Sequence, residues 1–231
     1  MMNLSTGSSY ARAGSSLSGL GTAATLSCKI RVSGAFILSA GAGGNPFLSI
    51  GNGAGTALRF ILSGYRTGGN AGVLLYDSTP TLVASAVGAD TAFDSAAYYV
   101  IYFHIDSGGI FVGIYQDDGT LVYSGTGTGA AVGASDAANG YVYAGLITGS
   151  CPTGAVDGIA FYSATLSGAN RYNHPKETDS NVLWYVRFQE GSGSSAANRV
   201  SGATDLTTWS AAWLAAGLWG SRALLTRRRR H

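Results

Sequence analysis

The residues that could carry out chemistry are few and lie far apart in the sequence. The 231-residue chain has two glutamates, Glu177 and Glu190, in different segments. Cleavage of a glycosidic bond needs two carboxylates held a fixed distance apart, and this spacing does not supply them. Asp117 and Asp118 directly precede a glycine, a position where aspartate favours turns because its side chain bonds the local backbone. We therefore interpret these two aspartates as turn residues.

The three histidines do not belong to a recognisable catalytic or metal-binding motif. His104 lies in the middle of a predicted strand, where we expect it to be a core or lining residue, His174 precedes a proline, and His231 is the last residue. The sequence has no Gly-x-Ser-x-Gly nucleophile elbow and no His-Glu-x-x-His or clustered cysteines at metal-binding spacing. Its glycine-rich stretches match no phosphate-binding pattern. The sequence thus predicts a protein that is not an enzyme and that needs no cofactor.

The two cysteines, Cys28 and Cys151, are separated by more than half of the chain. We expect two buried thiols that behave as small hydrophobic side chains. A single disulfide between them is the alternative, and the sequence leaves it open.

Short segments rich in Val, Ile, Tyr, Phe and Thr recur along the chain, bounded by Gly, Asn and Asp, as is typical of β-strands. We predict strands at 24–32, 35–39, 47–50, 57–62, 72–76, 82–87, 98–105, 110–116, 121–124, 141–146, 155–162 and 182–189. No sustained helical period of apolar residues occurs before residue 206. The pattern predicts an all-β protein with one domain over residues 1–205, followed by a short C-terminal arm over 206–231.

One hairpin is marked clearly by its turn residues. Asp118 and Gly119 separate two β-rich segments, and an Asp-Gly pair supplies the positive φ angles of a two-residue turn. The preceding segment 97–105 is apolar on both faces, which is expected for a central strand that is covered on both sides.

The charge of the chain is low and unevenly distributed. Charged residues make up 11% of the sequence, against about 25% in ordinary soluble domains. The net charge of +2 conceals an acidic body with no Lys or Arg between Arg66 and Arg171, and a basic end that contains Arg222 and the run 227–230. Weakly charged surfaces tend to associate, so we expect a protein that packs against neighbouring subunits, its own copies among them.

Several segments in the middle of the chain resemble the concanavalin-like, laminin-G-type jelly roll. They are 99–105, the hairpin 110–122, the strand 141–147 and, most specifically, Gly154-Ala-Val-Asp-Gly-Ile-Ala-Phe-Tyr-Ser-Ala-Thr-Leu-Ser. The resemblance implies an antiparallel two-sheet jelly-roll sandwich. The segment 181–198 resembles a motif that usually opens such a domain, so its late position implies a circularly permuted order or a strand exchanged with a neighbour.

The resemblance also raises two site expectations. Laminarinase-type relatives of the fold use a close pair of glutamates, which this chain lacks. Some laminin-G-type relatives bind calcium at the rim of the sandwich, and this leaves a calcium site open at Asp90, Asp94 and Asp157. Calcium requires six to eight oxygen ligands.

The C-terminal segment differs from the rest of the chain in its tryptophans and arginines. We read it as a short helix or an extended arm whose interaction residues are Trp209, Trp213, Trp219, Arg227, Arg228, Arg229 and Arg230. Aromatic residues and arginine are enriched in protein interfaces, so we predict that this arm leaves the sandwich and docks on a neighbouring subunit. The alternative, in which it folds back on its own sandwich, stays open. Nucleic acid and a membrane surface are less favoured, because the body is acidic and no aromatic residue lies within the arginine run.

The N-terminus lacks the basic and apolar regions of a signal peptide, and no segment approaches the roughly 18 apolar residues of a membrane span. Synthesis in the cytoplasm is therefore expected.

Our first functional hypothesis is a non-enzymatic structural or interaction protein of a viral (bacteriophage) particle, such as a capsid decoration or tail component, located in the virion. The alternative is a glycan-binding module of the laminin-G or lectin type, because many Tyr and Trp side chains could stack on sugars.

Overall fold

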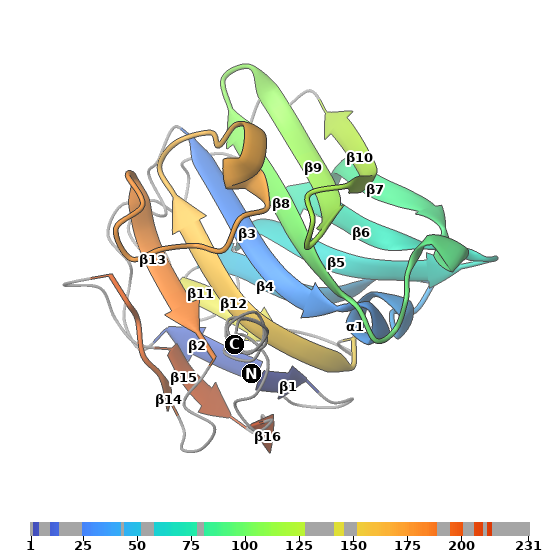
Figure 1. Cartoon of the computed structure of the whole chain (residues 1–231), viewed down its shortest axis with the longest axis horizontal. Coiled ribbons are helices and arrows are strands. Elements are labelled where there is room, and N and C mark those ends of the chain that lie inside the picture. Colours follow the sequence, from blue (N-terminus) through green and yellow to red (C-terminus); the bar gives the residue numbers. More distant parts are fainter. Residues whose placement is uncertain are drawn as a thin grey trace, which may run out of the picture.

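The computed structural model describes residues 2–4, 10–13, 25–42, 44–51, 58–77, 81–127, 141–145, 152–188, 195–200, 206–209 and 212–213. Within these residues the chain forms two antiparallel β-sheets packed face to face (Figure 1). The predicted all-β two-sheet sandwich is confirmed. None of the described helices is long and apolar enough to cross a membrane.

The sheet nearer the viewer in Figure 1, which we call the front sheet, is built around β3 and β12. Its order is β10 (Leu121–Gly127), β9 (Gly109–Gln116), β8 (Tyr98–Asp106), β3 (Leu26–Ser33), β12 (Gly154–Tyr162), β1 (Met2–Leu4) and β16 (Ala212–Trp213), with β13 (Val182–Arg187) also paired to β12. β1 pairs with the first residues of β12, and β13 with its later ones. The two strands thus share one edge of β12.

The other sheet, the back sheet, ends in a four-strand meander, from β4 through β7. Its order is β14 (Ser195–Ala196), β15 (Leu206–Trp209), β2 (Tyr10–Ala13), β11 (Tyr141–Gly145), β4 (Asn45–Gly51), β5 (Leu58–Thr67), β6 (Asn70–Asp77) and β7 (Leu82–Ala89). Neighbouring strands of this sheet run antiparallel throughout the described residues.

The core lies between the sheets and follows the alternation of side chains along the strands. Ile101 and Phe103 of β8 are fully buried, and so is Phe60 of the back sheet. The rings of Phe60 and Phe103 meet edge to face with their centroids 4.9 Å apart, a favoured arrangement for aromatic pairs. Because successive side chains of a strand point to opposite faces, the intervening residues of β8 lie on the outer face of the front sheet.

The prediction of a strand at 35–39 is wrong, because this segment forms the short helix α1 (Gly34–Leu38). Ser33 caps it, and its hydroxyl accepts a hydrogen bond of 3.3 Å from the amide of Phe36. Phe36 and Ile37 are buried. A short apolar run can occupy either a buried strand or a buried helix, and periodicity does not distinguish them.

The predicted hairpin joins β9 and β10, but its turn differs in detail. Gly119 has a φ of 91°, whereas Asp118 has no positive φ. The amide of Gly119 donates to the carbonyl of Gln116 at 3.0 Å, and the amide of Gln116 donates to the carbonyl of Thr120 at 2.9 Å. The loop therefore has three residues, with a single left-handed glycine at its end. In this common hairpin one glycine supplies all of the positive φ.

Two segments in the C-terminal part of the chain form strands that pair within this chain's own sheets. β13, which contains the first part of the motif at 181–198, pairs with β12, and Trp184 is fully buried. β15 and β16, in the segment expected to form an arm, pair with β2 and β1. This pairing satisfies backbone groups at the sheet edges. Residues 214–231 lie outside the described residues.

Candidate functional site

The outer face of the front sheet carries an unusual set of aromatic and basic side chains. They are Lys29 and Arg31 of β3, Tyr102 and His104 of β8, and Phe111 and Tyr115 of β9. The strand register places His104 beside Phe111, and Phe111 beside Thr126 of β10. These three residues form one row across the sheet.

Residues 163–181, between β12 and β13, cross much of this face, and we call them the covering segment (Figure 1). Ser27 donates to the carbonyl of Ala164 at 2.7 Å. The hydroxyl of Tyr102 accepts from the amide of Leu166 at 3.0 Å and lies 3.3 Å from its carbonyl, to which it donates. The covering segment, which includes η3 (Gly168–Arg171), is thus held through its main chain by side chains of the sheet.

The basic residues on this face are engaged by the covering segment or by rings. The Lys29 ammonium donates to the carbonyls of Asn170 and Asn173 at 3.0 and 3.1 Å, and burial lowers the pKa of Lys29 to about 8. Arg171 donates from Nε to the carbonyl of Leu166 at 2.9 Å. Its guanidinium lies 4.8 Å from the ring centroid of Phe111. A cation over an aromatic ring is attracted by the ring's negative face.

Arg31 joins two of the aspartates that the sequence singled out. Its guanidinium pairs with Asp117 at 2.6 Å and with Asp157 at 2.9 Å. Asp157 is 2% exposed, and this burial raises its pKa even though Arg31 opposes the shift. Asp118 accepts from the amide of Thr120 at 2.8 Å, as a turn residue does. These aspartates have structural partners.

The calcium candidates do not form a ligand set in the structure. Asp90 pairs with Arg66 at 3.0 Å, Asp94 accepts from the amide of Ala96 at 2.9 Å, and Asp157 pairs with Arg31. In the described ranges no group of three or more His, Cys, Asp or Glu side chains could hold a metal ion. Cys28 is a buried free thiol whose pKa is raised by burial, and Cys151 lies outside the described residues.

A small interior space lies beneath the covering segment. It measures about 20 Å³ and is lined by Lys29, Arg31, Asp157, His174 and Tyr185 among others. This volume accommodates about one water molecule. Burial lowers the pKa of His174 to about 4, so its ring is neutral at neutral pH. We interpret this space as part of the internal polar network and not as a ligand site.

A much larger groove remains open at the end of the β8–β9 hairpin, next to the covering segment. It has a volume of about 850 Å³ and is lined by Val83, His104, Asp106, Gly108, Gly109, Ile110, Phe111, Thr126 and Gly127. Small-molecule sites have volumes of about 300–1,000 Å³. The groove is therefore large enough for a ligand of several rings.

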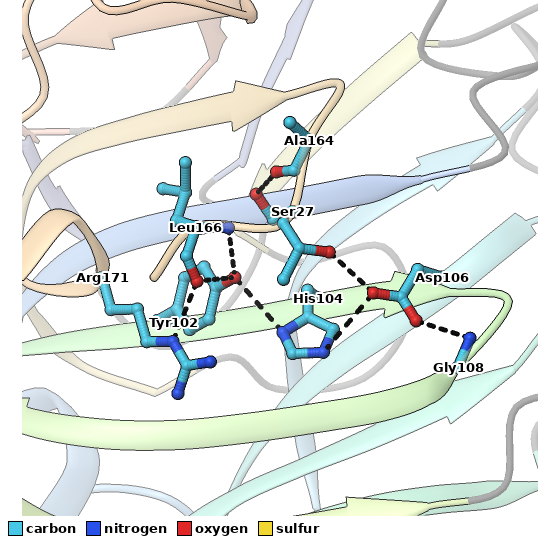
Figure 2. Close-up of polar contacts among 9 residues, drawn as sticks. Ser27, Tyr102, His104, Asp106, Gly108, Ala164, Leu166 and Arg171 are labelled. Carbon is cyan, nitrogen blue, oxygen red and sulfur yellow. Dashed lines mark hydrogen bonds and ion pairs between the residues drawn. The ribbon is translucent and has the colours of Figure 1, made fainter. Parts of the chain in front are cut away.

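Asp106 is a charged residue of the groove lining, and Figure 2 shows its polar contacts. The hydroxyl of Thr165 donates to one carboxylate oxygen at 2.7 Å, and the amide of Gly108 donates to the other at 2.8 Å. These bonds, the one from Thr165 foremost, lower the pKa of Asp106 against the opposing effect of burial. Asp106 is consequently ionised at neutral pH, with its side chain 22% exposed.

His104 connects Asp106 to the covered part of the face. Its Nε2 lies 3.8 Å from the carboxylate of Asp106, and its Nδ1 lies 3.2 Å from the hydroxyl of Tyr102 (Figure 2). The ring stacks on Phe111 with centroids 5.6 Å apart and planes inclined by 15°. Burial lowers the pKa of His104. A neutral imidazole, an ionised carboxylate, a hydroxyl and an aromatic ring thus meet at the groove.

The groove can bind polar ligands through hydrogen bonds. The carboxylate of Asp106 accepts them, the Thr126 hydroxyl donates or accepts them, and Phe111 provides an apolar wall. Among the described lining residues there is no second carboxylate of the kind that glycoside cleavage needs.

The structure does not bring the sequence-predicted interaction residues together at this groove. Trp209 and Trp213 lie in β15 and β16, whereas Trp219 and the arginines at 227–230 fall outside the described residues. The sequence did not predict the groove. The spacing of His104 and Asp106 places them on one face of β8, but Thr165 comes from a segment 59 residues further along the chain.

Comparison with known structures supports the fold. A candidate carbohydrate-binding protein from Bacteroides ovatus superimposes with a TM-score of 0.56 at 13% identity, over 94% of this chain and 60% of that one. The native heptameric SAP-like pentraxin from Limulus polyphemus gives a TM-score of 0.53 at 12% identity, over 75% of this chain and 78% of that one. This chain therefore spans about three fifths of the Bacteroides protein.

At these identities the likeness concerns the fold alone, which is a two-sheet antiparallel jelly-roll sandwich as the sequence motifs predicted. No protein-family model matches the sequence, and no curated protein matches it.

Proposed function

We propose that this protein is a non-enzymatic carbohydrate-binding module and that its ligand lies in the groove beside Asp106. The observation that carries the proposal is an open groove that combines an ionised carboxylate, a hydroxyl and an aromatic wall. Sugars present hydroxyl donors and an apolar C–H surface to a protein, and this lining matches both. A hydrogen bond to an ionised acceptor is about twice as strong as one between neutral groups.

The similarity to a candidate carbohydrate-binding protein supports the same class of function. The covering segment adds a physical argument, because it occupies much of the outer face with the chain's own residues, whereas the groove remains open. The groove is where this face offers room for a ligand of several rings.

The proposal is tested by screening the purified protein on an oligosaccharide array and measuring the affinity of each hit by calorimetry. Thr126→Val removes the groove hydroxyl while keeping a β-branched residue on an exposed position, and it should weaken binding about three- to tenfold if one hydrogen bond is lost. Glu177→Gln is the control, since it changes an exposed carboxylate outside the groove. If no oligosaccharide binds at millimolar concentration, or if the control weakens binding as much as Thr126→Val, the proposal is wrong.

A structural role in a bacteriophage particle is our second proposal. It rests on the 11% content of charged residues, which favours association, and on the similarity to a pentraxin that is heptameric. The two roles are compatible, because a particle subunit can also bind glycans.

A further inference from the structure

The formal charge of the described groove lining is negative. Among the described residues that line it, Asp106 carries a formal charge at neutral pH, and burial favours the neutral form of His104. The sequence has no Lys or Arg between residues 66 and 171. The described lining residues all belong to that stretch, so none of these is basic beyond the histidine.

Among the described residues Arg171 is a candidate for a compensating cation, because it contacts Phe111 of the groove lining, and its position limits that role. Its Nε donates to the carbonyl of Leu166, and its guanidinium lies against the rings of Phe111 and Tyr102, at 4.8 and 5.4 Å from their centroids. It is not one of the residues that line the groove. Turning it towards a ligand would break a hydrogen bond and two ring contacts.

Asp106 itself has acceptor capacity left for a ligand. A carboxylate offers about four lone-pair directions. The hydroxyl of Thr165 and the amide of Gly108 each use one, and the amide of Gly109 also interacts with the carboxylate. The remaining directions suit hydroxyl donors. A ligand carboxylate placed there would bring two negative charges together in a partly desolvated site, where repulsion is stronger than in water.

From this arrangement we infer that the groove binds uncharged glycans more tightly than glycans that carry a carboxylate, with Asp106 as the residue that discriminates between them. The inference rests on the proposed function, since it assigns a substrate class to the same groove.

Matched pairs of oligosaccharides test it. Each pair contains a neutral hexose oligomer and the same oligomer oxidised at carbon 6 to the uronate, so that charge is the main difference. We expect the neutral member of a binding pair to bind about three- to tenfold more tightly than the uronate, from the repulsion of two charges a few ångströms apart. The ratio should shrink in about 0.5 M salt, because ions screen the repulsion.

Asp106→Asn is the decisive variant, because asparagine also forms the local turn that Asp106 makes with Gly108. It should reduce the ratio of the two affinities towards one, whereas Thr126→Val should weaken both ligands and leave the ratio unchanged. Uronates that bind as tightly as their neutral partners would overturn the inference and leave the proposed function standing. An unchanged ratio in Asp106→Asn would overturn the role of Asp106. If neither member of any pair binds, the proposed function itself fails.

Discussion

Gly119 illustrates how single residues fix the outer face of the front sheet. Its φ of 91° belongs to the left-handed region, and a Cβ added to it would overlap the ring of Tyr172 in the covering segment. Gly68, in the turn between β5 and β6, also has a positive φ, of 58°, but an added Cβ there would meet no atom within 4 Å. Substitutions at Gly119 and Gly68 can therefore separate the energetic cost of backbone strain from that of steric overlap.

We predict that Gly119→Val destabilises the protein more than Gly68→Val does. Both variants place a β-branched residue at positive φ, which costs about 1–3 kcal/mol, but the first must also displace Tyr172. Urea denaturation of both variants measures the difference in unfolding free energy. Equal losses would show that the contact with Tyr172 has no energetic weight, and a loss below about 0.5 kcal/mol in Gly119→Val would contradict the turn.

His174 should make the protein sensitive to acid. Burial lowers its pKa from 6.5 to about 4, so between these values the unfolded chain binds more protons than the folded one. The unfolding free energy should therefore fall as the pH decreases from about 6.5 to about 4. His174→Gln should flatten this part of the stability profile relative to wild type, and His231→Gln, at the end of the sequence, serves as the control. A profile that is equally steep in His174→Gln would contradict the assignment.

At the scale of elements, the covering segment is a long connection that gains its order from the sheet beneath it. Its carbonyls accept hydrogen bonds from Ser27, Lys29 and Tyr102. It also packs on a small apolar cluster formed by Ala160, Tyr162 and Tyr185. Buried backbone groups need such partners, because unsatisfied ones are costly.

Tyr102→Phe should loosen this segment, because it leaves the amide of Leu166 without its side-chain acceptor and leaves the carbonyl of Leu166 with Arg171 alone. We expect a loss of about 1–3 kcal/mol in unfolding free energy and faster hydrogen exchange in residues 163–181. Tyr115→Phe is the matched control on the neighbouring strand, since the Tyr115 ring contacts Tyr172 but its hydroxyl makes no hydrogen bond to a described residue. Equal effects of the two substitutions would show that the hydroxyl of Tyr102 does not hold the segment.

At the scale of the whole molecule, an acidic body and a basic C-terminal end suggest contact between copies. The body lacks Lys and Arg between residues 66 and 171, whereas residues 227–230 are all arginine. A contact between unlike surfaces of identical subunits generates rings or open lattices. β15 and β16 pair with this chain's own sheets, and the arginine run lies outside the described residues.

We predict that truncation after Ser210 leaves a folded sandwich that no longer associates. Light scattering coupled to size-exclusion chromatography measures the mass, and circular dichroism checks the fold. The truncation also removes β16 and its pairing with β1, so a second variant, with the four arginines replaced by glutamine, tests the charged contact alone. Association of the intact chain should weaken with salt, because exposed charges are screened over about 8 Å at physiological ionic strength. Normal assembly of both variants would rule out this role.

The sequence by itself determined that the chain is all-β, because alternating apolar residues must face a core and the turn residues limit where strands end. The two-sheet arrangement was expected from the resemblance of its motifs to the jelly roll. The segment 98–105, predicted as a central strand, is β8, with neighbours on both sides. The hairpin at Gly119 was predicted in place, although its loop has one more residue than expected. Local patterns carry this information because side-chain alternation and left-handed glycines are properties of a few adjacent residues.

Only the tertiary structure decided the site. Thr165 reaches Asp106 across 59 positions of the sequence, and Arg171 reaches Phe111 across 60. The apolar segment 35–39 became a helix because of its cap and its place between the sheets. Contacts of this kind depend on how a long connection folds back over a sheet, and the free energy that selects one such path is summed over many distant residues. No local pattern encodes it, which is why the contact of Thr165 with Asp106 beside the groove could not be predicted from the sequence.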